Sequence, residues 1–146
     1  MRIAVCDDNA QDIERIKRYT IRMIEYAVDY DFFTKPEELV ATYMKAEQKP
    51  DMYILDIEMP GMDGLAVAKK IRTYDSKALI VFLTSYTKYM PDVFEVVTFD
   101  FIPKPITEDR LRLLFVKAES YLNMTNQTFS FSYRRSRYSL KFDEIL

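Results

Sequence analysis

The sequence contains no histidine, and among its 146 residues it has one cysteine and two glycines. The absence of histidine excludes histidine-ligated metal sites, Ser-His-Asp triads and Cys-His nucleophile pairs. The single Cys6 has no partner within the chain, which excludes a framework of intrachain disulfides. Because Cys6 lies in an apolar run, we expect it to be a small buried side chain.

Long apolar runs and an excess of one charge are also missing. No run approaches the roughly 18 residues that a membrane helix requires, and the start, "MRIAVCDD", becomes acidic too early for a secretory signal. The 21 basic and 23 acidic residues nearly balance, so no global field attracts nucleic acid or an anionic membrane. We therefore expect a soluble, cytoplasmic protein that does not bind membranes.

Short apolar runs alternate with segments of helical periodicity along most of the chain. The runs predict strands at residues 2–6, 26–33, 52–56, 78–83 and 99–102. Helices are expected between them and over residues 106–122, and the less regular segment 84–97 has room for a short helix. This alternation predicts an α/β fold, namely a doubly wound five-stranded parallel sheet with helices on both faces.

The C-terminal residues follow a different pattern. Residues 123–128, "NMTNQT", are polar and predict a linker, whereas residues 129–146 alternate between apolar and polar side chains. The alternation predicts two strands joined at "RRSR", a β-hairpin-like tail. Because a lone hairpin is only marginally stable, we interpret this tail as the start of a second domain that is cut short.

Polar side chains follow the ends of four predicted strands. Asp7 and Asp8 come after the first strand, Asp56 ends the third, Thr84 follows the fourth and Lys104 follows the fifth. The carboxyl ends of the strands in a doubly wound sheet share one edge, where ligands bind. We therefore expect three carboxylates, a hydroxyl and an ammonium group to form one shallow site.

This set of groups suits phosphoryl transfer. Two like charges about 4 Å apart repel by about 4 kcal/mol at an effective dielectric near 20, so clustered carboxylates need a cation, and Mg²⁺ is the natural one. Asp56 can then attack a phosphoryl group while Lys104 holds its oxygens and Thr84 donates a hydrogen bond to the product. Gly61 and Gly64 predict a sharp turn that leaves the space above Asp56 open.

Four segments, "AVCDDN", "DMYILDIEMPGMDG", "VFLTS" and "FDFIPKP", occur in this order within residues 1–122. They resemble the receiver domain of two-component response regulators, which has a flavodoxin-like fold. The resemblance implies that Asp56 is a phosphoacceptor that takes its phosphoryl group from a sensor histidine kinase. It also implies that Asp8 and Asp56 bind Mg²⁺ directly, Asp7 through water, and that the main-chain carbonyl of Glu58 completes the protein ligands.

The same resemblance assigns further roles. Thr84 would be the switch hydroxyl, Phe101 the switch aromatic and Lys104 a phosphate-binding residue, with a cis peptide at Lys104–Pro105. Phe101 lacks the hydroxyl of the tyrosine that is commoner in the family. Glu58 places a carboxylate beside the site, where it either repels incoming phosphate or holds a water molecule.

The phrase "DIEMPGMDG" together with the tail resembles the LytTR-type subgroup, in which a receiver precedes a mostly β DNA-binding domain. The resemblance implies a receiver at 1–122, a linker at 123–128 and the beginning of a truncated LytTR-like output domain at 129–146. It implies a regulatory phosphoacceptor that catalyses only its own phosphorylation and dephosphorylation. It further implies homodimerisation on phosphorylation, and DNA binding through a domain that is mostly absent here.

Two alternatives belong to other functional classes. A non-phosphorylated pseudo-receiver would keep the fold as an interaction module, but the joint presence of Asp7, Asp8, Asp56, Thr84 and Lys104 argues against it. A phosphatase of the haloacid-dehalogenase type also forms an aspartyl phosphate with Mg²⁺. Such an enzyme has its nucleophile after the first strand and a second aspartate two positions later, an order that this chain does not have.

Overall fold

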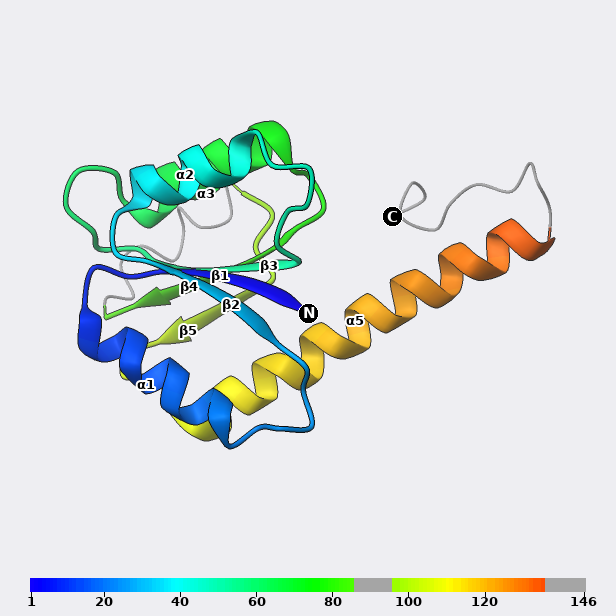
Figure 1. Ribbon diagram of the computed structural model, residues 1–146, viewed down its shortest axis with the longest axis horizontal. Helices are drawn as coiled ribbons and strands as arrows, with labels where there is room; N and C mark the ends of the chain where they lie inside the picture. Colours follow the sequence, from blue (N-terminus) through cyan, green and yellow to red (C-terminus); the bar gives the residue numbers. More distant parts are fainter. Residues whose placement is uncertain (86–95, 136–146) are drawn as a thin grey trace. The chain divides into compact units, whose positions relative to one another are not determined.

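The computed structural model describes residues 1–85 and 96–135 and contains a five-stranded sheet whose paired strands are all parallel (Figure 1). The strands are β1 (Arg2–Cys6), β2 (Asp29–Phe33), β3 (Met52–Asp56), β4 (Leu79–Thr84) and β5 (Asp100–Pro103). Their order in the sheet is β2-β1-β3-β4-β5, so the strand order reverses beside β1 and β3. Ligands bind at the carboxyl ends of the strands near such a reversal.

The helices in the described residues are α1 (Ala10–Ile21), α2 (Pro36–Met44), α3 (Gly64–Tyr74) and α5 (Glu108–Arg135). Figure 1 shows α1 on one face of the sheet and α2 and α3 on the other. The doubly wound fold that the sequence predicts is therefore confirmed. The short helix expected within residues 84–97 falls largely on residues 86–95, which lie outside the described residues.

The burial of each strand follows its place in the sheet. Every residue of β3 and β4 is buried, as expected for central parallel strands covered on both faces, whereas β2 is an edge strand in which every residue is exposed or only partly buried. Cys6 at the end of β1 is buried and contacts Met59 Sδ at 3.6 Å. Burial raises the pKa of the Cys6 thiol to about 12, with the nearby carboxylates adding to the shift.

Two helices begin directly beside the carboxyl edge of the sheet because a polar side chain caps each of them. Asn9 accepts hydrogen bonds from the backbone N–H groups of Gln11 and Asp12, and so starts α1 at Ala10, four residues after the end of β1. Asp63 accepts one from the N–H of Ala66 at 2.8 Å and starts α3. These caps fix the loops that follow β1 and β3.

Each of the two glycines has its own role in the loop after β3. Gly61 has a φ of 83°, a left-handed conformation that glycine adopts without strain. A Cβ at Gly64 would lie 2.3 Å from the carbonyl oxygen of Asp56, so only glycine lets α3 begin this close to the end of β3. The predicted sharp turn is confirmed, and its closest backbone approach is to Asp56 itself.

The chain divides into two compact units, Met1–Arg112 and Leu113–Leu146. The second unit contains most of α5, on which Leu114, Phe115 and Ala118 are buried at spacings of one and three residues. None of the helices in the described parts of the chain is both long and apolar enough to cross a membrane.

The sequence-based expectation for the C-terminal residues is wrong in part. Helix α5 continues to Arg135, through the linker predicted at 123–128 and through the start of the strand predicted from Phe129. No glycine or proline follows Pro105, so nothing in the sequence stops a helix that has already formed, whereas a hairpin without further strands is marginal. The rest of the predicted hairpin, residues 136–146, lies outside the described residues.

We predict that Gly64→Ala lowers the free energy of unfolding by about 2–3 kcal/mol, because the new Cβ collides with the Asp56 backbone. Helix propensity alone predicts the opposite sign, since alanine is the better helix former. Urea denaturation measures the difference. The control is Gly61→Ala, whose Cβ would meet only Glu37 Oε1 at 3.5 Å and whose cost, about 1 kcal/mol, comes from its positive φ. A Gly64→Ala protein as stable as the wild type would contradict the argument.

Candidate functional site

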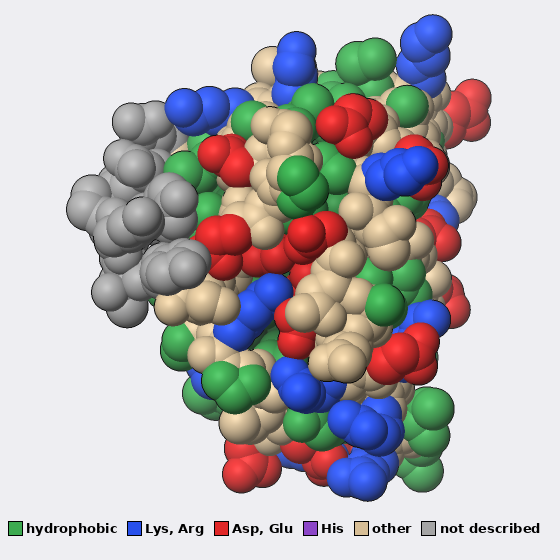
Figure 2. All heavy atoms as spheres, turned by 90° about the vertical axis from the view of Figure 1, so that its left-hand side faces the viewer, with side chains coloured by type: hydrophobic (Ala, Val, Ile, Leu, Met, Phe, Trp, Pro, Cys, Tyr) green, Lys and Arg blue, Asp and Glu red, His purple; other side chains and the backbone are tan. Residues whose placement is uncertain are grey.

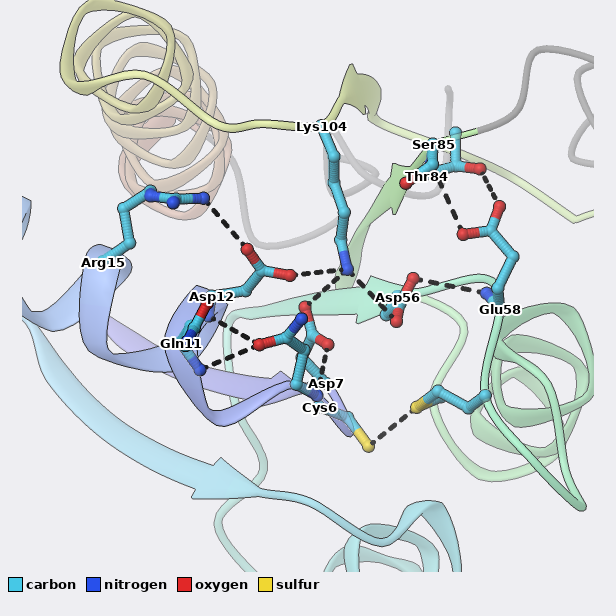
Figure 3. Close-up of polar contacts among 12 residues, drawn as sticks. Cys6, Asp7, Gln11, Asp12, Arg15, Asp56, Glu58, Thr84, Ser85 and Lys104 are labelled. Atoms are coloured by element: carbon cyan, nitrogen blue, oxygen red, sulfur yellow. Dashed lines mark hydrogen bonds and ion pairs between the residues drawn. The ribbon is translucent and has the colours of Figure 1, made fainter.

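The polar residues predicted at the strand ends meet at the carboxyl edge of the sheet (Figures 2 and 3). The strands end nearly in step, since Asp56 pairs with Leu83 and Thr84 with Pro103. Carboxylate oxygens of Asp7, Asp8 and Asp56 all lie within 4.8 Å of one another. Figure 2 shows acidic side chains gathered next to basic ones on this face.

Lys104 extends into the acidic cluster from the loop after β5. Its Nζ lies 3.0 Å from Asp7 Oδ2 and 3.3 Å from Asp56 Oδ2. It also lies 2.9 Å from Oδ2 of Asp12. The lysine is largely enclosed, with only 13% of its side chain exposed, so its charge acts mainly on these carboxylates.

Asp12 is a member of the cluster that the sequence analysis missed. It lies in the first turn of α1, where its other oxygen binds Arg15 at 3.0 Å. An acidic residue in a first helical turn is ordinarily explained by the helix dipole, and no strand end marks this position. One feature of the sequence could have identified Asp12. It follows Asp8 by four residues, about one helical turn, and it lies on a helix that begins beside the site.

Burial changes the protonation equilibria of the cluster. Asp56 is 2% exposed, and loss of hydration, together with the charge of Asp7, raises its pKa to about 7 despite the opposing charge of Lys104. Burial also raises the pKa of Asp7. For Lys104 burial alone lowers the pKa, but the hydrogen bond to Asp12 and the charges of Asp7 and Asp56 outweigh it, so the amine stays protonated.

These carboxylates fit a divalent cation with oxygen ligands. Asp7 Oδ2 is buried, and its contact with Lys104 is an ion pair without hydrogen-bond geometry. Asp56 is buried as well, whereas Asp8 is exposed, so the group opens towards solvent on the side of Asp8. Like charges this close favour a cation over further protonation, and the ligand set is the carboxylate and water type that Mg²⁺ prefers.

Glu58 lies on the other side of Asp56 and reaches towards β4. Its backbone N–H donates to Asp56 Oδ1 at 3.2 Å. Its side chain accepts a hydrogen bond from the Thr84 hydroxyl, and the Ser85 N–H donates to its second oxygen at 3.4 Å. Figure 3 shows the resulting division, with Lys104 among the aspartates on one side and Glu58 with Thr84 and Ser85 on the other.

Thr84 and Lys104 are also joined through the backbone. The N–H of Lys104 donates to the carbonyl of Thr84 at 2.8 Å, and the predicted cis peptide at Lys104–Pro105 is present. Phe101 is half-buried on β5 opposite Phe82 and packs against the core. Its predicted role as a switch aromatic stays a prediction.

Comparison with known proteins agrees with this geometry. The family model of the response regulator receiver domain matches residues 3–115. Sensory transduction protein LytT of Oceanobacillus iheyensis is 41% identical over 69 residues, which is 46% of this chain and 28% of the relative. The positive alginate biosynthesis regulatory protein of Pseudomonas aeruginosa is 29% identical over 118 residues, which is 81% of this chain and 47% of the relative.

Among solved structures, response regulator protein TrrA of Thermotoga maritima has a TM-score of 0.68 and 32% sequence identity, over 80% of this chain and 97% of that one. The chain spans less than half the length of the two curated relatives described above. The match to the family model covers all of the sheet except Arg2, and every strand-end residue of the site. The chain therefore belongs to the response regulator receiver family of two-component systems, and LytT regulators are among its relatives.

Proposed function

We propose that this receiver is switched by Mg²⁺-dependent transfer of a phosphoryl group from a sensor histidine kinase to Asp56. The observation that carries the proposal is the meeting of Asp7, Asp8 and Asp56 within 4.8 Å of one another, with the Lys104 ammonium bound to two of them. Phosphoryl transfer requires mainly a positioned nucleophile and positive charge beside the phosphoryl oxygens, and these groups would supply both.

The proposed reaction uses the side chains that meet at this edge of the sheet. A carboxylate oxygen of Asp56 attacks the phosphorus of a phosphohistidine, the P–N bond breaks, and its electron pair returns to the imidazole nitrogen. The product is an acyl phosphate on Asp56. Because the chain has no histidine, the donor is another protein or a small phosphodonor. Lys104 neutralises charge on the phosphoryl oxygens, and Thr84 donates a hydrogen bond to the product.

In the proposed site Asp8 and Asp56 would hold Mg²⁺ directly, Asp7 would act through water, and the main-chain carbonyl of Glu58 would be a further ligand. The metal supplies positive charge to the phosphoryl oxygens, which lowers the electrostatic cost of bringing an anion to an acidic cluster. The structure of TrrA is of a complex with Mg²⁺-BeF, which supports a magnesium site in this receiver.

The proposed consequence of phosphorylation is a change in the contacts made by Thr84 and Phe101. A new charge on Asp56 would favour one of two conformations of the segment that carries these residues. The surface that a partner protein contacts would change as a result. We propose that the readout is homodimerisation, and that a LytTR-type domain beyond this chain then binds DNA. The similarity to LytT and to the alginate regulatory protein supports a role in transcription. The receiver itself is regulatory.

The two alternative functions are not equally compatible with these findings. The haloacid-dehalogenase phosphatase is wrong, because the family match and the order of the acidic residues both assign the chain to the receivers. A pseudo-receiver keeps the same fold, so it is distinguished from the proposed function only by a measurement of phosphorylation.

We predict that acetyl phosphate with Mg²⁺ adds one phosphoryl group to the protein, seen by intact mass. The group should be absent when EDTA replaces Mg²⁺, and absent from Asp56→Asn, which has the same shape but cannot form an acyl phosphate. A wild-type protein that gains no mass would favour the pseudo-receiver. A gain that persists in Asp56→Asn would place the phosphoacceptor elsewhere.

We also predict that Asp56→Asn raises the free energy of unfolding of the metal-free protein by about 1–3 kcal/mol at pH 8, since it removes a buried like charge. The folded-state pKa of Asp56, about 7, lies above its ordinary value of 3.8. Between pH 4 and pH 7 the folded wild type holds a proton that the unfolded chain has already released, so the free energy of unfolding falls as the pH rises through this range.

Urea denaturation in EDTA measures this difference, with the exposed Glu47→Gln as a control that removes an equal charge far from the cluster. Saturating Mg²⁺ should stabilise the wild type by about 2.7 kcal/mol at a concentration 100 times the Kd. It should stabilise Asp56→Asn less, because one ligand charge is missing. An Asp56→Asn protein less stable than the wild type in EDTA would contradict the electrostatic account.

A further inference from the structure

The Glu58 carboxylate occupies two hydrogen-bond donors beside Asp56, and one of them is the Thr84 hydroxyl, which in the proposed function donates to the phosphoryl group. One oxygen accepts from the Thr84 hydroxyl, and the other from the Ser85 N–H at 3.4 Å. Thr84 is buried at the end of β4, and Glu58 is only partly exposed. The carboxylate is therefore placed on two successive donors at the edge of the sheet, close to Asp56 (Figure 3).

The backbone of Glu58 explains how its side chain reaches this position. Its N–H donates to Asp56 Oδ1 at 3.2 Å, so the residue begins beside the phosphoacceptor. The side chain then extends to a strand end 26 residues away in the sequence. A carboxylate and a phosphoryl group are both anions that accept charge-assisted hydrogen bonds, so they compete for the same donors.

The cationic side of the site does not relieve this competition. Lys104 forms an ion pair with Asp56 and also with Asp7 and Asp12, and these last two lie on the opposite side of Asp56 from the Glu58 side chain (Figure 3). An anion that enters beside Asp56 thus meets a further negative charge at the donors it has to bind.

We propose that Glu58 is a resident anion at the Thr84–Ser85 donor pair, and that the incoming phosphoryl group has to displace its carboxylate. Glu58 therefore slows phosphorylation of Asp56 and holds the Thr84 hydroxyl before phosphorylation occurs. The two possibilities raised by the sequence, repulsion of phosphate or retention of a water molecule, are replaced by direct competition for two donors. This inference rests on the proposed function of Asp56.

The test compares initial rates of phosphorylation by acetyl phosphate with Mg²⁺ for the wild type, Glu58→Gln and Glu58→Ala, followed by intact mass. Glutamine keeps the shape and one acceptor oxygen but removes the charge, and alanine removes both. We expect Glu58→Gln to react roughly 3–30-fold faster than the wild type, a change of the size that one lost charge contact produces. Glu58→Ala should react at least as fast as Glu58→Gln.

The matched control is Glu37→Gln, which removes an exposed carboxylate near the same loop, one whose Oε1 lies 3.5 Å from the Cβ position of Gly61. This variant should react at the wild-type rate. A second readout uses no phosphodonor and no metal: the NMR resonances of the Ser85 amide and the Thr84 methyl group. They should shift in both Glu58 variants and stay in place in Glu37→Gln.

The outcomes separate the two proposals. If the Glu58 variants react at the wild-type rate, or if the Ser85 amide is unmoved in Glu58→Ala, the competition is absent and the inference is overturned. If every variant is accelerated equally, including Glu37→Gln, general electrostatics rather than displacement sets the rate, and the inference is again overturned. If no protein gains a phosphoryl group while the NMR shifts occur as expected, the contact is real and the proposed function fails.

Discussion

The site depends on one ammonium group placed among carboxylates that repel each other. Lys104 binds Asp7, Asp12 and Asp56 within 3.3 Å, and it comes from the strand end farthest in sequence from β1. Without that charge the buried aspartates would be strongly destabilising, because a buried charge that loses its partner costs several kcal/mol. The lysine therefore makes an acidic edge compatible with a folded sheet, and it leaves a charge deficit that a divalent cation can fill.

The fold positions these groups through a few local devices. The parallel register ends β3, β4 and β5 nearly together, and the caps at Asn9 and Asp63 begin α1 and α3 beside that edge. Gly64 lets α3 begin against the backbone of Asp56. Catalytic geometry here comes from strand ends and tight turns, which hold short side chains more precisely than long loops would.

Most of the fold and the five strand-end residues could be predicted from the sequence, because alternating strands and helices dictate which edge the strand ends share. Asp12 could not be predicted in this way, since its position in a first helical turn has an ordinary explanation. The contact of the Glu58 side chain with Thr84 and Ser85 could not be predicted either, because spacing along the sequence does not show in which direction a side chain points. The prediction for the C-terminal residues was wrong in part for another reason: their alternating pattern competes with a helix that no glycine or proline interrupts, and in the described residues α5 continues to Arg135.

The buried Cys6 gives the protein a chemical property that its receiver role does not use. Alkylating reagents react with the thiolate, and a side chain that is fully enclosed and has a pKa of about 12 offers them neither access nor charge. We therefore expect the folded chain to react very slowly with maleimides. Fluorophores or spin labels can therefore be attached at a single engineered surface cysteine without first removing the natural one.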